Sequence, residues 1–155
     1  MNRKLETDVS VEAASNGPHA GTGDGSKVAV PATRPSWLPR ALEQLRAMHN
    51  VPENWDGYHG DAPRAESIEA ATNFLFLVIS GVSLPPPFIS PTRIGGILIE
   101  WEQDCHELEV EIDSPDVASY VYLNTRTAEE ASGEFSPVQG PPEPFLTLAT
   151  RLQTV

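Results

Sequence analysis

The sequence predicts an α+β fold, a two-layer sandwich in which two or three helices cover an antiparallel meander of three or four strands. Apolar residues recur at helical spacing in residues 36–50 and again in residues 61–82, and the period then changes to two in residues 97–112. Clusters of Gly, Pro and Asp separate these segments. At 155 residues the chain has room for one domain, which we place at residues 36–155 behind a leader of residues 1–35.

Residues 1–35 are predicted to be a disordered leader, because stretches such as Gly21-Thr22-Gly23-Asp24-Gly25-Ser26 offer little apolar surface to offset the entropy lost on ordering. A flexible leader without a role is one interpretation, and a recognition tail is the other. The first residues lack the apolar segment of a signal peptide, and no 18-residue apolar run is present. A single cysteine excludes an intrachain disulfide and fits a reducing compartment. We therefore expect a cytoplasmic location and no membrane contact.

Two helices are predicted before the sheet. The first begins at Ser36 or within two residues of it, with Ser36 as a cap and Pro39 early in the helix. The second is predicted to be capped by Asp61, with Pro63 in its first turn and Gly81 at its end. Their apolar stripes consist of Leu38, Leu42, Leu45 and Met48 in the first helix and Ile68, Ala71, Leu75, Val78 and Val82 in the second.

A hairpin follows, in which apolar residues alternate with glutamates. A tight turn at Asp104-Cys105 would place apolar opposite apolar and acid opposite acid. The expected partners are Glu102 with Glu107, Trp101 with Leu108, Glu100 with Glu109 and Ile99 with Val110. Further strands are predicted at residues 120–124 and 130–135, a loop at 136–144, and a short last helix at 145–152.

The formal net charge of −12 is concentrated in one part of the chain. Residues 100–143 contain twelve acidic residues and a single base, Arg126, whereas the charges of residues 1–35 balance. Direct binding of nucleic acid needs a basic surface and is disfavoured here. A basic protein partner is favoured.

Five glutamates are predicted to share one face of the sheet, with Tyr120 or Tyr122 beside them. They are Glu100, Glu102, Glu107, Glu109 and Glu111. Opposed like charges destabilise a strand pair by up to about 1 kcal/mol. One interpretation is a solvated face that resists edge pairing, and the other is a docking surface for an Arg- and Lys-rich partner.

The loop Asn54-Trp55-Asp56-Gly57-Tyr58-His59-Gly60-Asp61 has two interpretations. Its aromatics beside polar groups suit a ligand pocket or partner anchor formed by Asn54, Trp55, Asp56 and Tyr58. Alternatively the loop is a structural clasp, in which Trp55 fills the core between the helices and Asp56-Gly57 forms a turn.

Catalytic and metal sites are less well supported by the sequence. The carboxylates and imidazole of Asp56, His59 and Asp61 match no metal-binding motif, so no metal or cofactor is expected. Cys105 and His106 are adjacent, and adjacent residues of a strand point to opposite faces. A carboxylate-based hydrolase using Asp56 and Asp61 is the remaining enzymatic alternative.

The chain resembles a family of small, uncharacterised bacterial proteins with an N-W-D-G-Y loop, a P-T-x-x-G-G turn, and L-E-W-E and E-L-E-x-E-I strands. The matching segments are Asn54 to Tyr58, Pro91-Thr92 with Gly95-Gly96, Ile99 to Glu102, and Glu107 to Ile112. The resemblance covers residues 36–135 and departs at His59-Gly60-Asp61. It implies the fold of this segment and no particular activity.

The sequence thus favours a non-enzymatic bacterial interaction protein that docks a basic protein through its acidic sheet face, in an inhibitory, antitoxin- or immunity-like role. The alternatives are a small-ligand-binding domain built on the Trp55–Tyr58 loop and the carboxylate-based hydrolase.

Overall fold

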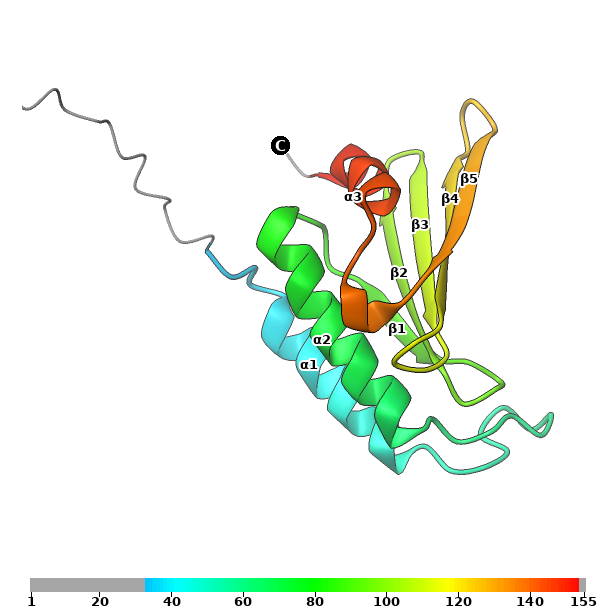
Figure 1. The fold of residues 1–155 in the computed structure, drawn as a ribbon. Coiled ribbons are helices and arrows are strands. Elements are labelled where there is room, and N and C mark those ends of the chain that lie inside the picture. The colour runs from blue at the N-terminus through cyan, green and yellow to red at the C-terminus, as the bar shows by residue number, and fades with distance from the viewer. Residues whose placement is uncertain (1–32, 154–155) are drawn as a thin grey trace, which may run out of the picture. The chain divides into compact units, whose positions relative to one another are not determined.

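The computed structural model describes residues 33–153 of the chain. Within them, three helices lie on one side of a five-stranded antiparallel sheet (Figure 1). The helices are α1 (Leu38–Ala47), α2 (Ala65–Gly81) and α3 (Glu143–Ala149), with short 3-10 helices at Met48–Asn50, Pro137–Gln139 and Thr150–Leu152. The strands are β1 (Phe88–Pro91), β2 (Ile97–Gln103), β3 (His106–Ile112), β4 (Ala118–Asn124) and β5 (Glu129–Phe135).

The predicted α+β class and antiparallel meander are confirmed, with one strand more than expected. The sheet order follows the chain, so each strand pairs with its neighbours in sequence. The additional strand is β1, a four-residue segment that ends at Pro91 and follows Pro85-Pro86-Pro87. The predicted leader lies outside the described residues, except for residues 33–35.

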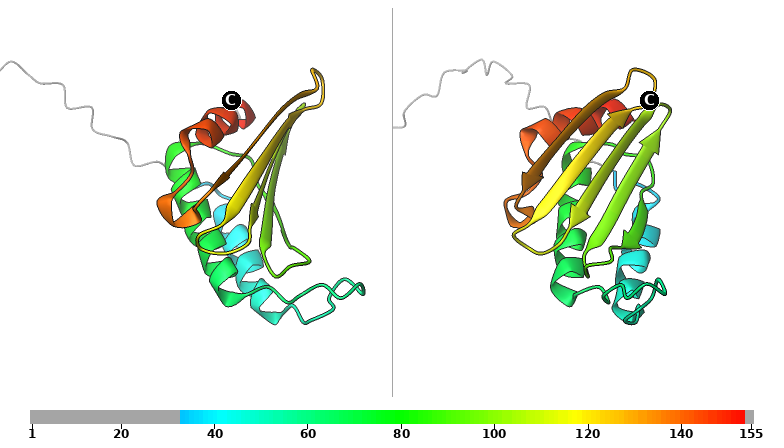
Figure 2. Two further views of the ribbon diagram at one scale, coloured as in Figure 1. Left: turned by 45° about the vertical axis from the view of Figure 1, so that its right-hand side comes forward. Right: turned by 90° about the vertical axis from the view of Figure 1, so that its right-hand side faces the viewer.

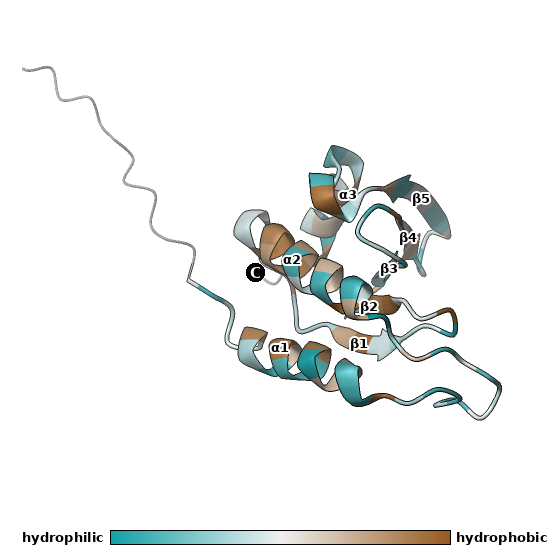
Figure 3. Ribbon diagram, turned by 60° about the horizontal axis from the view of Figure 1, so that its bottom comes forward, coloured by the Kyte–Doolittle hydropathy of each residue, from teal (hydrophilic) through white to brown (hydrophobic). Residues whose placement is uncertain are grey.

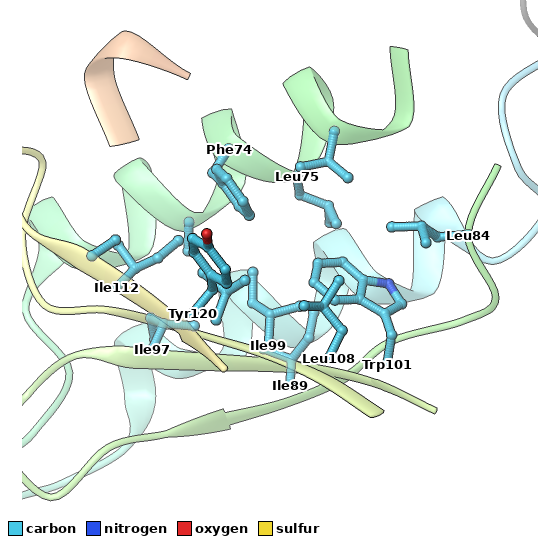
Figure 4. Packing of buried hydrophobic residues seen from close by; sticks show 14 of the residues in the cluster. Phe74, Leu75, Leu84, Ile89, Ile97, Ile99, Trp101, Leu108, Ile112 and Tyr120 are labelled. Carbon is cyan, nitrogen blue, oxygen red and sulfur yellow. The ribbon is translucent and has the colours of Figure 1, made fainter. Parts of the chain in front are cut away.

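The core lies between the helices and the inner face of the sheet (Figure 4). Phe145 of α3 packs edge-on against Phe74 of α2, with ring centroids 5.5 Å apart, and against Trp101 of β2 at 6.5 Å. Both apolar helix stripes are turned toward this core, and α1 and α2 also carry hydrophilic residues along their length (Figure 3). The helix α3 contributes Phe145, Leu148 and Ala149 to the core, and the 3-10 helix after it contributes Leu152.

The first helix begins at Leu38, within two residues of Ser36 as predicted, but the predicted cap of this helix and the predicted start of the second need correction. The first helix is preceded by Trp37 rather than capped by the Ser36 side chain, although Pro39 does lie in its first turn. The second helix begins at Ala65, so Asp61 does not cap it and Pro63 precedes it. Instead Asp61 donates its backbone N–H to Arg93 O at 2.9 Å, which joins the loop to the β1–β2 turn. Gly81 ends the helix as predicted.

None of the helices in residues 33–153 combines the length and the apolar character needed to cross a lipid bilayer.

Candidate functional site

The sheet has an outer face on the side away from the helices (Figure 2). The predicted glutamates lie on this face, as the burial of their neighbours shows. Side chains alternate between faces along a strand. Because Ile97, Ile99 and Trp101 are buried against the helices, their neighbours on β2 point outward. The outward glutamates of β2 and β3 are Glu100, Glu102, Glu107, Glu109 and Glu111.

The predicted register of the central hairpin is confirmed. Glu100 lies opposite Glu109 and Glu102 lies opposite Glu107, so acid faces acid at two successive pairs of the same face. Glu111 lies opposite Leu98 on β2. The structure therefore brings all five predicted glutamates together on adjacent strands.

Two further glutamates extend this surface onto β5. Glu130 pairs with Leu123 and Glu134 pairs with Ser119, so both belong to the rows that contain Glu107 and Glu111. We call the seven glutamates together the acidic face. Sequence reasoning missed the last two, although the alternation within β5, where Ala131 and Phe135 take the other face, would have assigned them.

Apolar side chains interrupt the acidic face. Phe88 of β1 is 62% exposed and Val121 of β4 is 49% exposed, and both lie in the row that contains Glu100 and Glu109. The expectation that Tyr120 or Tyr122 lies beside the glutamates is wrong. Both tyrosines are buried on the inner face, since Tyr120 pairs with Val110 and Tyr122 pairs with Leu108.

Partial burial, together with the crowding of carboxylates, raises the pKa values of two of these glutamates. Partial burial raises the pKa of Glu100, and the negative charge of Glu109 raises it further. Burial likewise raises the pKa of Glu111, with contributions from Asp113 and then Glu109. Glu109 thus opposes ionisation of two neighbours. No positive charge of residues 33–153 is among the causes that act on these two carboxylates.

The acidic face has no ion pair with any lysine or arginine of residues 33–153. The ion pairs there join Arg64 with Glu66, Arg93 with Asp56 and Arg151 with Glu129. A depression of about 500 Å³ lies over the β1 side of the face. It is lined by Pro86, Phe88, Glu100, Trp101, Glu102, Glu107 and Glu109. Its chemistry, a carboxylate cluster beside an exposed ring, suits an organic cation such as a guanidinium or ammonium group.

The loop of residues 51–64 is held together by its own polar side chains. Asp56 Oδ1 accepts the backbone N–H groups of Tyr58 at 2.8 Å and Gly60 at 2.9 Å, and Asn54 Oδ1 accepts that of His59 at 2.8 Å. The hydrogen bond from Tyr58 is the largest cause of a lowered pKa of Asp56. Asn54 and His59 have positive φ angles of 60° and 64°. The carboxylate and amide are therefore engaged with loop backbone.

Trp55 does not fill the core as the clasp interpretation predicts. Its side chain is half-buried and lies outside the core cluster, and its indole N–H donates to Asp61 O at 3.2 Å. Tyr58 is 74% exposed, and the guanidinium of Arg93 lies 5.9 Å from the centre of its ring. The loop is thus a surface clasp attached to the β1–β2 turn.

The adjacent residues Cys105 and His106, the other candidates from the sequence, have separate surroundings. His106 Nδ1 lies 2.7 Å from the buried Tyr122 hydroxyl, which also accepts a hydrogen bond from Arg151 at 3.2 Å, whereas Cys105 lies in the β2–β3 turn. Among residues 33–153, no three His, Cys, Asp or Glu side chains are grouped so that they could hold a metal ion.

Comparison of the chain with family models, with curated proteins and with solved structures finds no match in any of the three. Membership of the family of small bacterial proteins with the N-W-D-G-Y loop therefore stays a prediction.

Proposed function

We propose that the chain is a non-enzymatic interaction protein whose acidic face binds a basic protein partner and inhibits it, in an antitoxin- or immunity-like role. The observation that carries the proposal is the collection of seven glutamates on one open sheet face, without an ion pair to any cation of residues 33–153. Opposed carboxylates cost stability in the free protein. A bound cationic surface would remove that cost.

The apolar residues of the face support a protein partner rather than a free cation. Stable interfaces combine charge complementarity with desolvated apolar contacts. Phe88 and Val121 stand at either side of the Glu100–Glu109 pair and are about half exposed or more. An arginine of the partner could stack on Phe88 while its guanidinium pairs with Glu100. Charge would speed the encounter and the apolar contacts would slow dissociation.

The test is affinity capture from a cell extract, followed by calorimetry with each retained protein in purified form. We compare the wild-type chain with a variant carrying Glu100→Gln, Glu102→Gln, Glu107→Gln and Glu109→Gln. The expected partner is basic, with a pI above about 9. The face variant is expected to bind at least about tenfold more weakly, and the wild-type affinity to fall as salt is raised.

The matched control changes four glutamates away from the acidic face, so that the net charge alters by the same amount. All four are exposed residues of the helices: Glu43, Glu66, Glu69 and Glu143. This control is expected to bind within about twofold of wild type. Unchanged binding by the face variant would contradict the proposal, and so would equal weakening of binding by the face variant and the control variant. An assay of the partner's own activity, with and without the chain, tests inhibition.

A further inference from the structure

The strand β5 forms one edge of the sheet (Figure 2). Outside its ladder with β4, residues 129–135 make no backbone–backbone hydrogen bond with any residue of 33–153. The hydrogen-bond pattern follows from the register. The two-residue turn closes with the Gln103–His106 pair, which is a hydrogen-bonded pair in such hairpins, and the pattern then alternates across each ladder. On this alternation β4 uses Tyr120 and Tyr122 to pair with β5.

The open edge of β5 therefore belongs to Glu130, Ser132 and Glu134. Their backbone N–H and C=O groups point away from β4, and all three residues are exposed. An unpaired row of this kind is a template for another strand. Their side chains lie on the same side of the sheet as the acidic face. A strand added here would continue the sheet and its acidic surface together.

The opposite edge is not equivalent. The strand β1 has four residues, and the same alternation turns only Ile89 and Pro91 outward. Proline has no backbone N–H, so this edge offers a single donor. Among residues 33–153, β5 is the edge with an uninterrupted set of donors and acceptors.

A second copy of the chain fits this edge poorly. Antiparallel pairing of two β5 strands about Ser132 would place Glu130 of each copy opposite Glu134 of the other. Both cross-strand pairs would then bring like charges together, which destabilises the pairing. The same glutamates favour lysine or arginine at the facing positions.

We infer that β5 accepts an extended basic segment of the partner as a sixth strand, with Lys or Arg at alternate positions facing Glu130, Ser132 and Glu134. This inference rests on the proposed function, because the segment belongs to the same basic partner. The alternating cations lie on the acidic face, and the residues between them lie on the side of α3. In an antiparallel sixth strand, the residues opposite Glu130, Ser132 and Glu134 form hydrogen-bonded pairs with them, because these three residues direct their backbone groups outward. The cationic residues are therefore those whose backbone N–H and C=O groups bond to β5.

The test uses the full chain and a fluorescein-labelled nonapeptide in which lysine alternates with valine. Two methylated versions have the same charge: one carries N-methyl groups on its lysine amides and the other on its valine amides. Binding is measured by fluorescence anisotropy. Methylation of the lysines blocks the amides that face β5 and is expected to weaken binding at least about tenfold, whereas methylation of the valines leaves it within about threefold.

Equal binding of the two methylated peptides would overturn the inference, and so would the absence of binding by the unmodified peptide. If the position of the N-methyl groups has no effect on peptide binding, while the four-glutamine face variant still binds the basic partner more weakly, the edge inference fails and the proposed function stands. If the position of the N-methyl groups does affect peptide binding, and the face variant binds the partner as the wild type does, the proposed function fails.

A chain variant gives an independent readout. Ser132→Pro removes an outward N–H and leaves the β4 ladder in place, so it is expected to weaken peptide binding about tenfold, whereas Ser132→Ala is expected to have no effect. Circular dichroism checks that both variants are folded. Light scattering that showed a dimer of the wild-type chain dissociated by Ser132→Pro would identify a second copy as the occupant and overturn the inference.

Discussion

Asp56 and Arg93 form an ion pair, with 2.8 Å between Asp56 Oδ2 and Arg93 Nε, that joins the surface loop to the β1–β2 turn. The same guanidinium donates to Tyr58 O at 2.6 Å. One side chain from the β1–β2 turn thus holds both the carboxylate that organises the loop and the backbone beside it.

Arg93→Ala is therefore expected to loosen the loop while leaving the core intact. The backbone amides of Tyr58 and Gly60, which bond to Asp56, should exchange with solvent about tenfold faster. Because the arginine is largely exposed, the melting temperature should change little. Hydrogen exchange by NMR measures the two amides, and thermal unfolding measures the melting temperature. Arg40→Ala on α1 is the control. Unaltered exchange at these two amides would show that the ion pair does not hold the loop.

The loop should also loosen in acid. The pKa of Asp56 is lowered in the folded chain, so its ionised form stabilises the loop above the ordinary pKa of 3.8. That contribution is lost as the pH falls through the lower, folded value. The Asp56 carboxyl should titrate below 3.8 in an NMR experiment, and the loop amides should lose protection as the pH falls through that lowered pKa. In Asp56→Asn this acid step should be absent. Titration at or above the ordinary value would contradict the expectation.

Glu109→Gln is expected to stabilise the chain near neutral pH, by about 0.5 kcal/mol in the free energy of unfolding. The pKa values of Glu100 and Glu111 are raised, so the folded state binds more protons than the unfolded state between about pH 4.5 and the folded values. Stability therefore falls as the pH rises through this range. Urea unfolding at about pH 7 and about pH 3.5 should show the gain only at the higher pH. Glu43→Gln on α1 is the charge-matched control, and an equal gain at both pH values would contradict the mechanism.

Two glycines should respond differently to alanine. A Cβ at Gly96 would lie 2.7 Å from Ile112 O, a backbone atom that cannot move aside, whereas a Cβ at Gly81 meets nothing within 4 Å. We expect Gly96→Ala to destabilise by about 1–3 kcal/mol. Gly81→Ala should be neutral or stabilising. Thermal unfolding compares the two, and similar melting temperatures would contradict the close approach.

Tyr122→Phe should destabilise the fold by about 1–2 kcal/mol, because it removes the hydroxyl that bonds to His106 and Arg151. Tyr120→Phe is the control, since within the described residues the structure gives its hydroxyl no hydrogen bond; it should cost less than about 0.5 kcal/mol. Chemical denaturation measures both. Equal losses would assign the effect to ring packing rather than to the hydroxyl.

The acidic hairpin could be predicted from sequence because a two-residue turn fixes the register and the alternation fixes the faces. The face of Tyr120 could not be predicted in this way. Residues 120–123 of β4 are all apolar or aromatic, so their pattern does not distinguish the buried face from the exposed one. The start of α2 depends on a long-range contact, the bond from Arg64 N–H to Gly95 O at 2.9 Å. The N-cap pattern near Asp61 contained no information about that contact, and the four-residue β1 was too short to show a period.

Phe145 follows all five strands in the sequence, yet its ring packs against Phe74, Trp101, Tyr120 and Phe135. The sheet is built from strands that pair with their neighbours in sequence, so it can form progressively as the chain leaves the ribosome. The aromatic cluster cannot be completed until α3 has emerged. The rings of Phe74, Trp101, Tyr120 and Phe135 therefore lack one packing partner until α3 has been synthesised, even where the strands have already paired.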